Sequence, residues 1–98
     1  MHLMNKGDFV FDVRLDRKPE KFIKQSDPKL KQRLFAVFET LEQNPVPAQL
    51  FDVRKIEGEA DSYRIRISSF RILYKVFWNE KIIRVTKIER RKDSTYKG

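Results

Sequence analysis

The sequence predicts a small single-domain α+β protein, spanning residues 1–98, with the element order β-α-α-β-β-β-β. Alternating apolar residues indicate an N-terminal strand, and helical spacing follows as far as about residue 44. β-Branched and aromatic runs between short polar turns fill the rest. We therefore expect a mainly antiparallel, twisted sheet, with two helices packed on one face and a basic opposite face.

The N-terminal quarter should contain one strand and one short helix. Alternate positions near the start are apolar, as in a half-buried strand: Phe9, Phe11, Val13 and Leu15. A short helix is expected after Asp16. Pro19 then lies in the first turn, where a missing N–H costs little, and Phe22 and Ile23 face inward.

A longer helix is predicted to begin at the pair Asp27-Pro28. Asp can cap a helix and Pro fits its first position. Apolar residues then recur at helical spacing: Leu30, Leu34, Val37, Phe38 and Leu41. The helix should end near Asn44, because the residue before Pro45 is disfavoured in the α region.

The remainder reads as four antiparallel strands, expected near residues 50–56, 62–67, 70–78 and 81–90. Polar turns separate them at residues 57–60, 68–69 and 79–80. If the last two turns are two-residue hairpins, Ile67 pairs with Phe70 and Trp78 pairs with Lys81. This pairing fixes which side chains share a face of the sheet.

Two faces of opposite character follow from this register. The core face takes Tyr63, Ile65, Ile67, Phe70, Ile72, Tyr74, Val76, Trp78, Ile83 and Val85. The other face takes six cations over an apolar floor of Leu73, Phe77, Ile82 and Ile88, the cations being Arg64, Arg66, Arg71, Lys75, Arg84 and Arg90. The sequence thus predicts a cationic sheet face opposite the helices.

The distribution of charge supports an anionic partner for that face. Residues 1–62 hold 11 Lys/Arg and 11 Asp/Glu, whereas residues 63–98 hold 11 against 3 and so carry the whole net charge of +8. Arg66 is expected directly across from Arg71, and opposed like charges destabilise a strand pair. Only Glu80, Glu89 and Asp93 offer local counter-charges, so we expect phosphate or an acidic protein segment to bind here rather than water alone.

The residue inventory restricts the chemistry. The chain has no Cys, its one histidine is His2, and its carboxylates form no recognisable ligand set, so we predict no metal and no small-molecule cofactor. No apolar run approaches the roughly 20 residues of a membrane span, which predicts no membrane association and a cytoplasmic location. RNA carries its own nucleophile, the 2′-hydroxyl, so a site of Arg and Tyr can cleave RNA without metal. Tyr96, beyond the last strand, is the tyrosine expected to remain accessible.

The stretch YRIRISSFRILY at residues 63–74, followed by IERRK at residues 88–92 and by Tyr96, resembles the RelE branch of the RelE/ParE toxin superfamily. The resemblance covers nearly the whole chain. It implies the toxin of a toxin–antitoxin pair, which enters the ribosomal A site and cuts mRNA there by 2′-hydroxyl attack. It also implies a cognate antitoxin protein that forms a complex with the toxin and holds it inactive.

The resemblance assigns roles to five residues. Arg71 would stabilise the phosphate in the transition state, and Arg64 and Arg66 would bind phosphate. Arg90 would contact the leaving group or a phosphate, and Tyr96 would stack on a base and orient the 2′-hydroxyl. Further contacts to RNA or the ribosome are expected from Lys75, Arg84, Arg91 and Lys92. The best-known members have lysines where this chain has Arg64 and Arg66, so the identity of the general base stays open.

Two other functions remain open at this stage. One is a ParE-like toxin, which has a similar fold but binds DNA gyrase and catalyses no reaction. The other is a small RNA-binding module, whose cationic face follows phosphates with salt-sensitive affinity but does not cut.

Overall fold

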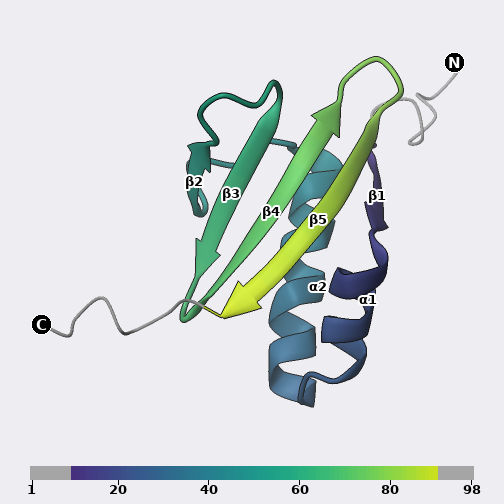
Figure 1. Ribbon diagram of the computed structural model, residues 1–98, viewed down its shortest axis with the longest axis vertical. Helices are drawn as coiled ribbons and strands as arrows, with labels where there is room; N and C mark the ends of the chain where they lie inside the picture. Colours follow the sequence, from purple (N-terminus) through teal and green to yellow (C-terminus); the bar gives the residue numbers. More distant parts are fainter. Residues whose placement is uncertain (1–9, 91–98) are drawn as a thin grey trace, which may run out of the picture.

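The computed structural model describes residues 10–90, which form five strands and two helices in the predicted order. The elements are β1 (Asp12–Leu15), α1 (Arg17–Lys24), α2 (Pro28–Gln43), β2 (Asp52–Lys55), β3 (Ser62–Ile67), β4 (Phe70–Phe77) and β5 (Ile82–Arg90). All five strands join one sheet in the order β1-β5-β4-β3-β2. β1 runs parallel to β5, and the other neighbours are antiparallel. Both helices lie on one side of this sheet, which confirms the predicted α+β architecture (Figure 1).

The long helix α2 begins and ends where the sequence predicts. The Asp27 carboxylate accepts a hydrogen bond from the backbone N–H of Leu30 at 2.8 Å, and Pro28 occupies the first helical position. The helix ends at Gln43, and Asn44 turns to extended backbone immediately before Pro45. Four apolar residues of the helix are buried against the rest of the protein: Leu34, Val37, Phe38 and Leu41.

The core lies between the helices and the central strands. The helices contribute Ile23, Leu34, Val37, Phe38 and Leu41. The sheet contributes Ile65, Ile72, Tyr74, Val76, Ile83, Val85 and Ile88. Because side chains alternate along a strand, the residues between these point to the opposite face of the sheet, which we call the open face.

A β-bulge in β5 corrects part of the predicted register. The two hairpin pairings are confirmed, since Ile67 lies opposite Phe70 and the Lys81 N–H donates to the Trp78 carbonyl. The β4–β5 register then shifts, because Tyr74 pairs with Val85 whereas Leu73 pairs with Lys87. The extra residue is Thr86, whose hydroxyl donates to the Leu73 carbonyl at 3.3 Å.

After the bulge, each residue of β5 points to the face of the sheet opposite to the one predicted. Ile88 lies opposite Ile72 and is buried in the core, and Arg90 lies opposite Phe70 on the same side. Both were predicted on the cationic face, and both predictions were wrong because strict alternation ends at Thr86. Trp78, predicted on the core face, is 44% exposed because it lies beyond the end of β4.

Tyr74 links the sheet to the segment after α2. Its ring is buried and stacks on Tyr63, and its hydroxyl donates to the Pro45 carbonyl at 2.7 Å. Burial, with a smaller contribution from Tyr63, raises the pKa of Tyr74 well above its usual value. The tyrosine is therefore structural, as its expected place on the core face suggests.

This pKa shift predicts a loss of stability in alkali. Tyrosine in an unfolded chain ionises near pH 10, so above about pH 10 the unfolded state loses the phenolic proton first. The stabilisation is thus complete below that pH and is lost as the pH rises toward the raised pKa of the folded state.

Tyr74→Phe should lose about 1 kcal/mol of unfolding free energy at neutral pH through its missing hydrogen bond. Its free energy of unfolding, measured in urea, should then fall less than that of the parent between about pH 9 and about pH 11. Equal declines would contradict this account.

Candidate nucleic-acid interface

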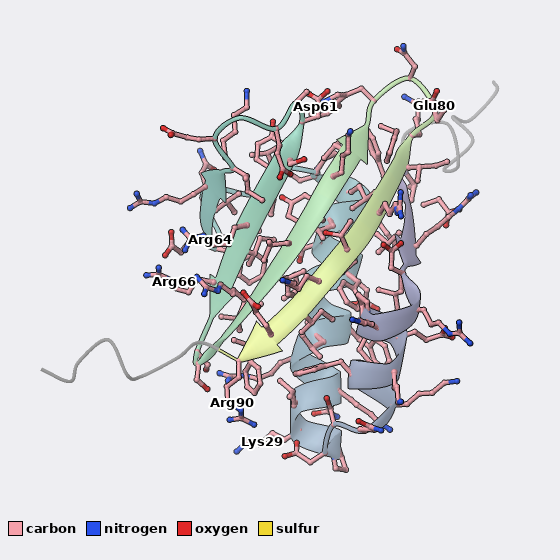
Figure 2. The ribbon with its side chains drawn as sticks, in the orientation of Figure 1. Lys29, Asp61, Arg64, Arg66, Glu80 and Arg90 are labelled. Atoms are coloured by element: carbon pink, nitrogen blue, oxygen red, sulfur yellow. The ribbon has the colours of Figure 1, made fainter. Side chains whose placement is uncertain are left out.

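The open face gathers five of the six predicted cations. Arg64 and Arg66 lie on β3, Arg71 and Lys75 on β4, and Arg84 on β5, each alternating with buried residues. Strand pairing adds further cations to the same face, namely Arg14, Arg54 and Lys87. Figure 2 shows Arg64 and Arg66 projecting from the sheet away from the helices. The cations concentrate on one surface although they come from all five strands.

Arg66 and Arg71 lie directly opposite each other, as the sequence predicts. Two carboxylates offset their repulsion. Glu89 accepts a hydrogen bond from Arg71 Nε at 2.9 Å, across the β4–β5 pair. Asp52, on β2, lies 3.9 Å from Arg66 Nη1 and 3.8 Å from Arg64 Nη2. Asp52 was not among the predicted counter-charges, because it lies outside residues 63–98, where those were sought.

Asp52 neutralises this cluster incompletely. The same carboxylate also lies 3.8 Å from Arg54 Nε, so three guanidiniums share one negative charge. Distances near 4 Å fall outside hydrogen-bonding range, so the three guanidiniums have donors without an acceptor among residues 10–90. Arg54, Arg64 and Arg66 can therefore bind a further anion such as phosphate.

Arg64 is the least exposed of these arginines, with a side chain 14% exposed. Burial lowers its pKa, and the neighbouring Arg66 adds to this effect while Asp52 opposes it. The guanidinium still remains charged at neutral pH, because an arginine pKa starts far above that range. Because Arg64 is partly desolvated and lies among other cations, binding of an anion beside it is electrostatically favourable.

Arg84 has a different environment. Its guanidinium donates twice to Asp16, at 2.7 and 3.1 Å, and this hydrogen-bonded carboxylate raises the pKa of Arg84. A hollow of about 470 Å³ adjoins the pair, lined by Arg14, Leu15, Asp16, Phe77, Glu80, Ile82 and Arg84. Arg84 is thus largely neutralised within the protein, unlike Arg64 and Arg66.

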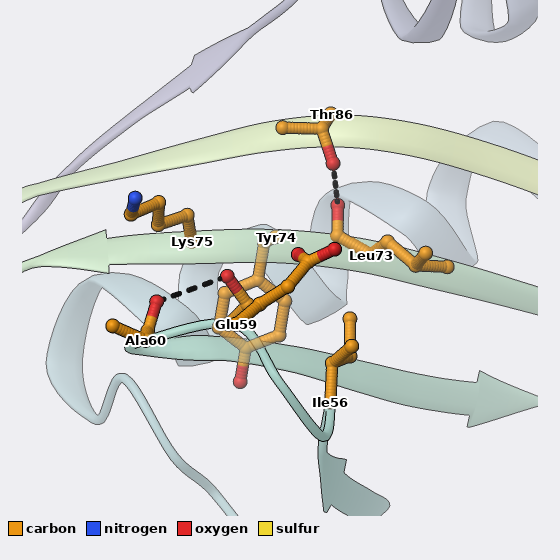
Figure 3. Close-up of a pocket in the computed structure, with 8 residues that line it drawn as sticks. Ile56, Glu59, Ala60, Leu73, Tyr74, Lys75 and Thr86 are labelled. Atoms are coloured by element: carbon orange, nitrogen blue, oxygen red, sulfur yellow. Dashed lines mark hydrogen bonds between the residues drawn. The ribbon is translucent and has the colours of Figure 1, made fainter.

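A second hollow, of about 320 Å³, lies between β4 and the loop that joins β2 to β3 (Figure 3). Glu59 lines it from the loop, and Leu73 and Lys75 line it from β4. Leu73 is also the strand neighbour of Arg64. The hollow therefore continues the cationic surface toward Lys75, which also lies over the Phe77 ring.

The remaining predicted site residues are not gathered in this cluster. The Arg90 guanidinium lies over the Phe70 ring, 4.7 Å from its centroid, on the helix side of the sheet. In Figure 2 it lies at the same end of the molecule as Lys29. Arg91, Lys92 and Tyr96 fall outside the described residues.

Within residues 10–90, His, Cys, Asp and Glu form no group of three or more able to hold a metal ion. None of the helices in this part of the chain has the length and apolar character needed to span a membrane.

Two sequence comparisons place the chain among toxins of toxin–antitoxin systems. A sequence model of the ParE toxin of type II toxin–antitoxin systems (parDE) matches residues 14–95. A Methanocaldococcus jannaschii protein assigned as toxin RelE1 is 36% identical over 88 residues, covering 90% of this chain and 97% of that one.

Solved structures agree with this match. The archaeal RelE–RelB complex from Pyrococcus horikoshii OT3 superposes with a TM-score of 0.78 at 30% identity, covering 86% of this chain and 98% of the other. The intact E. coli RelBE toxin–antitoxin complex shows the same fold, with a TM-score of 0.72 at 16% identity and coverages of 85% and 99%. The chain therefore belongs to the ParE toxin family of type II toxin–antitoxin systems, in which it is a RelE-type toxin.

Proposed function

We propose that this toxin is a ribosome-dependent mRNA endonuclease that cuts mRNA in the ribosomal A site by metal-independent 2′-hydroxyl attack, and so inhibits translation. The observation that carries the proposal is the cluster of Arg64, Arg66 and Arg71 on adjacent strands, with fewer carboxylates than cations around it. A dense group of guanidiniums suits a substrate whose charge increases during the reaction, as at the phosphorus of a cleaving RNA.

Each arginine has a separate role in this proposal. Arg71 binds the scissile phosphate through its Nη groups, which have no protein hydrogen-bond partner within residues 10–90, whereas its Nε is held by Glu89. Arg64 and Arg66 bind the phosphate or its neighbour in the RNA chain. Lys75 and Arg84, with Arg91 and Lys92 near the C-terminus, contact RNA or the ribosome. Tyr96 acts from the C-terminal end on the base and the 2′-hydroxyl. Arg90 lies at the end of β5 on the helix side of the sheet, so its proposed contact with a phosphate or the leaving group requires its side chain to leave the Phe70 ring.

The ribosome supplies what an open sheet face lacks. Cleavage requires the 2′-oxygen, the phosphorus and the leaving 5′-oxygen to lie in line, and a flexible RNA on an exposed surface seldom adopts that geometry. A codon held in the ribosomal A site is already ordered. The toxin then has to supply mainly charge stabilisation and proton transfer.

The partner that restrains the toxin is proposed to be an antitoxin with acidic or amphipathic segments. The related structures from Pyrococcus horikoshii and E. coli are complexes of RelE with RelB, or RelBE toxin–antitoxin complexes. A chain that covered the open face would neutralise Arg64 and Arg66 and exclude RNA. Both proteins would act in the cytoplasm, where translating ribosomes are found.

The test is cleavage of mRNA on programmed ribosomes, with naked RNA as a control. We expect cuts within the A-site codon that leave a 5′-hydroxyl, and no cut at a nucleotide whose 2′-hydroxyl is replaced by hydrogen. Cleavage that survives this substitution would contradict the proposed nucleophile. Intact mRNA together with gyrase-linked DNA breaks would instead support a ParE-like activity, and salt-sensitive binding to naked RNA without cuts would support an RNA-binding module.

A further inference from the structure

The proposed reaction needs a group that takes the proton from the 2′-hydroxyl, and the arginine cluster contains none. Arginine keeps its proton at all physiological pH values, so Arg64 and Arg66 cannot serve as general bases. The two carboxylates that contact the cluster are Asp52 and Glu89. Either can accept a proton in principle, and their positions distinguish them.

Glu89 lies beside the arginine to which we assign the scissile phosphate. Its Oε2 accepts a hydrogen bond from Arg71 Nε, and its Oε1 lies 3.9 Å from Lys87 Nζ, outside hydrogen-bonding range. The side chain is 35% exposed on the open face, so RNA can reach it. Asp52 instead lies beyond Arg66, at the edge strand, and is shared by three guanidiniums.

The β-bulge is what brings Glu89 to this position. Glu89 is the strand partner of Arg71 only because Thr86 adds one residue to β5. With regular alternation the same side chain would point toward the helices. The charged groups that face Glu89 within residues 10–90 are Arg71 on β4 and Lys87 on β5 itself, since β1 pairs with β5 only as far as Val85.

We propose that Glu89 is the general base of the cleavage reaction, an inference that rests on the proposed endonuclease function. A phosphate held by the Nη groups of Arg71 lies one guanidinium away from the Glu89 carboxylate, close enough for the adjacent ribose to reach it. Glu89 takes the proton of the 2′-hydroxyl as the 2′-oxygen bonds to phosphorus. The bond from phosphorus to the 5′-oxygen then breaks, and the leaving oxygen takes a proton from water. The products are a 2′,3′-cyclic phosphate and a 5′-hydroxyl, and Glu89 returns its proton to solvent.

The decisive variant is Glu89→Gln. The glutamine oxygen can still accept the hydrogen bond from Arg71 Nε, but the amide cannot take up a proton at neutral pH. The single-turnover rate of mRNA cleavage on programmed ribosomes should fall by about 10²- to 10⁴-fold, the usual contribution of a general base. Glu89→Asp keeps a carboxylate at this position and should restore part of the rate.

A matched control removes the same charge elsewhere. Glu39 is exposed on α2, on the helix side of the sheet, so Glu39→Gln should cleave at the parental rate. A Glu89→Gln protein that keeps the parental thermal midpoint and cleaves within about threefold of the parent would overturn the proposal, because Glu89 would then only orient Arg71 or balance its charge. A parent that makes no cut would remove the proposed function and the role of Glu89 together, whereas an active parent with an active variant removes only the latter.

Discussion

Arg71→Ala is expected to slow A-site cleavage of mRNA by about 10²- to 10³-fold, the usual effect of removing one group that stabilises transition-state charge. The Arg71 guanidinium lies in the middle of the open face, and Glu89 holds its Nε so that the Nη groups remain available for phosphate. The salt bridge that is lost is about one-third exposed on both sides, so it should contribute no more than about 1 kcal/mol to stability. Single-turnover cleavage on programmed ribosomes and thermal unfolding would separate the two effects.

Two further variants test whether the effect of Arg71→Ala is specific to that guanidinium. Arg17→Ala removes an equal charge from an exposed position on α1 and should leave cleavage unchanged. Arg71→Lys keeps the charge but loses the planar fork, so an intermediate rate is expected. An Arg71→Ala protein that cuts mRNA and arrests growth as well as the parent would remove the central residue of the proposed mechanism.

Leu34→Ala should produce a large loss of stability. Leu34 is 0% exposed and packs in the cluster between the helices and the sheet. Truncation of a buried leucine costs about 2–5 kcal/mol, because the transfer energy is lost and a cavity remains. A domain of this size has a total stability of about 5–15 kcal/mol, so the variant should unfold at a much lower urea concentration.

Leu50→Ala provides the same chemical change without burial. Leu50 is 68% exposed, and its truncation should alter the free energy of unfolding by less than about 0.5 kcal/mol. Similar losses in the two variants would show that Leu34 does not lie in the core.

Local patterns were sufficient to predict the elements and both tight hairpins. Asp27-Pro28 defines the start of α2, and the apolar spacing that follows defines its buried side. Two-residue turns fix the pairing of Ile67 with Phe70, which places Arg66 opposite Arg71. These features depend on residues close together in sequence, so a single chain contains the necessary information.

The predictions failed where a feature was non-local or irregular. The bulge left a visible signal, because two polar residues, Thr86 and Lys87, stand between Val85 and Ile88 and break the alternation. That signal would have moved Arg90 off the open face and placed Glu89 beside Arg71. The Asp52 contacts left no local signal, since they depend on β2 pairing with β3 across the long turn between them.

The parallel pairing of β1 with β5 determines when the sheet can be completed during synthesis of the chain. Asp12 lies beside Ile82, so β1 gains its neighbour only after both helices and the three intervening strands have been translated. Contacts between residues so distant in sequence also slow folding, because a long loop must close before they form. A nascent chain that stops before β5 lacks the partner of β1 and has no Glu89 to hold Arg71. Synthesis of β5 is therefore the step that joins β1 to the sheet and gives Arg71 its carboxylate partner.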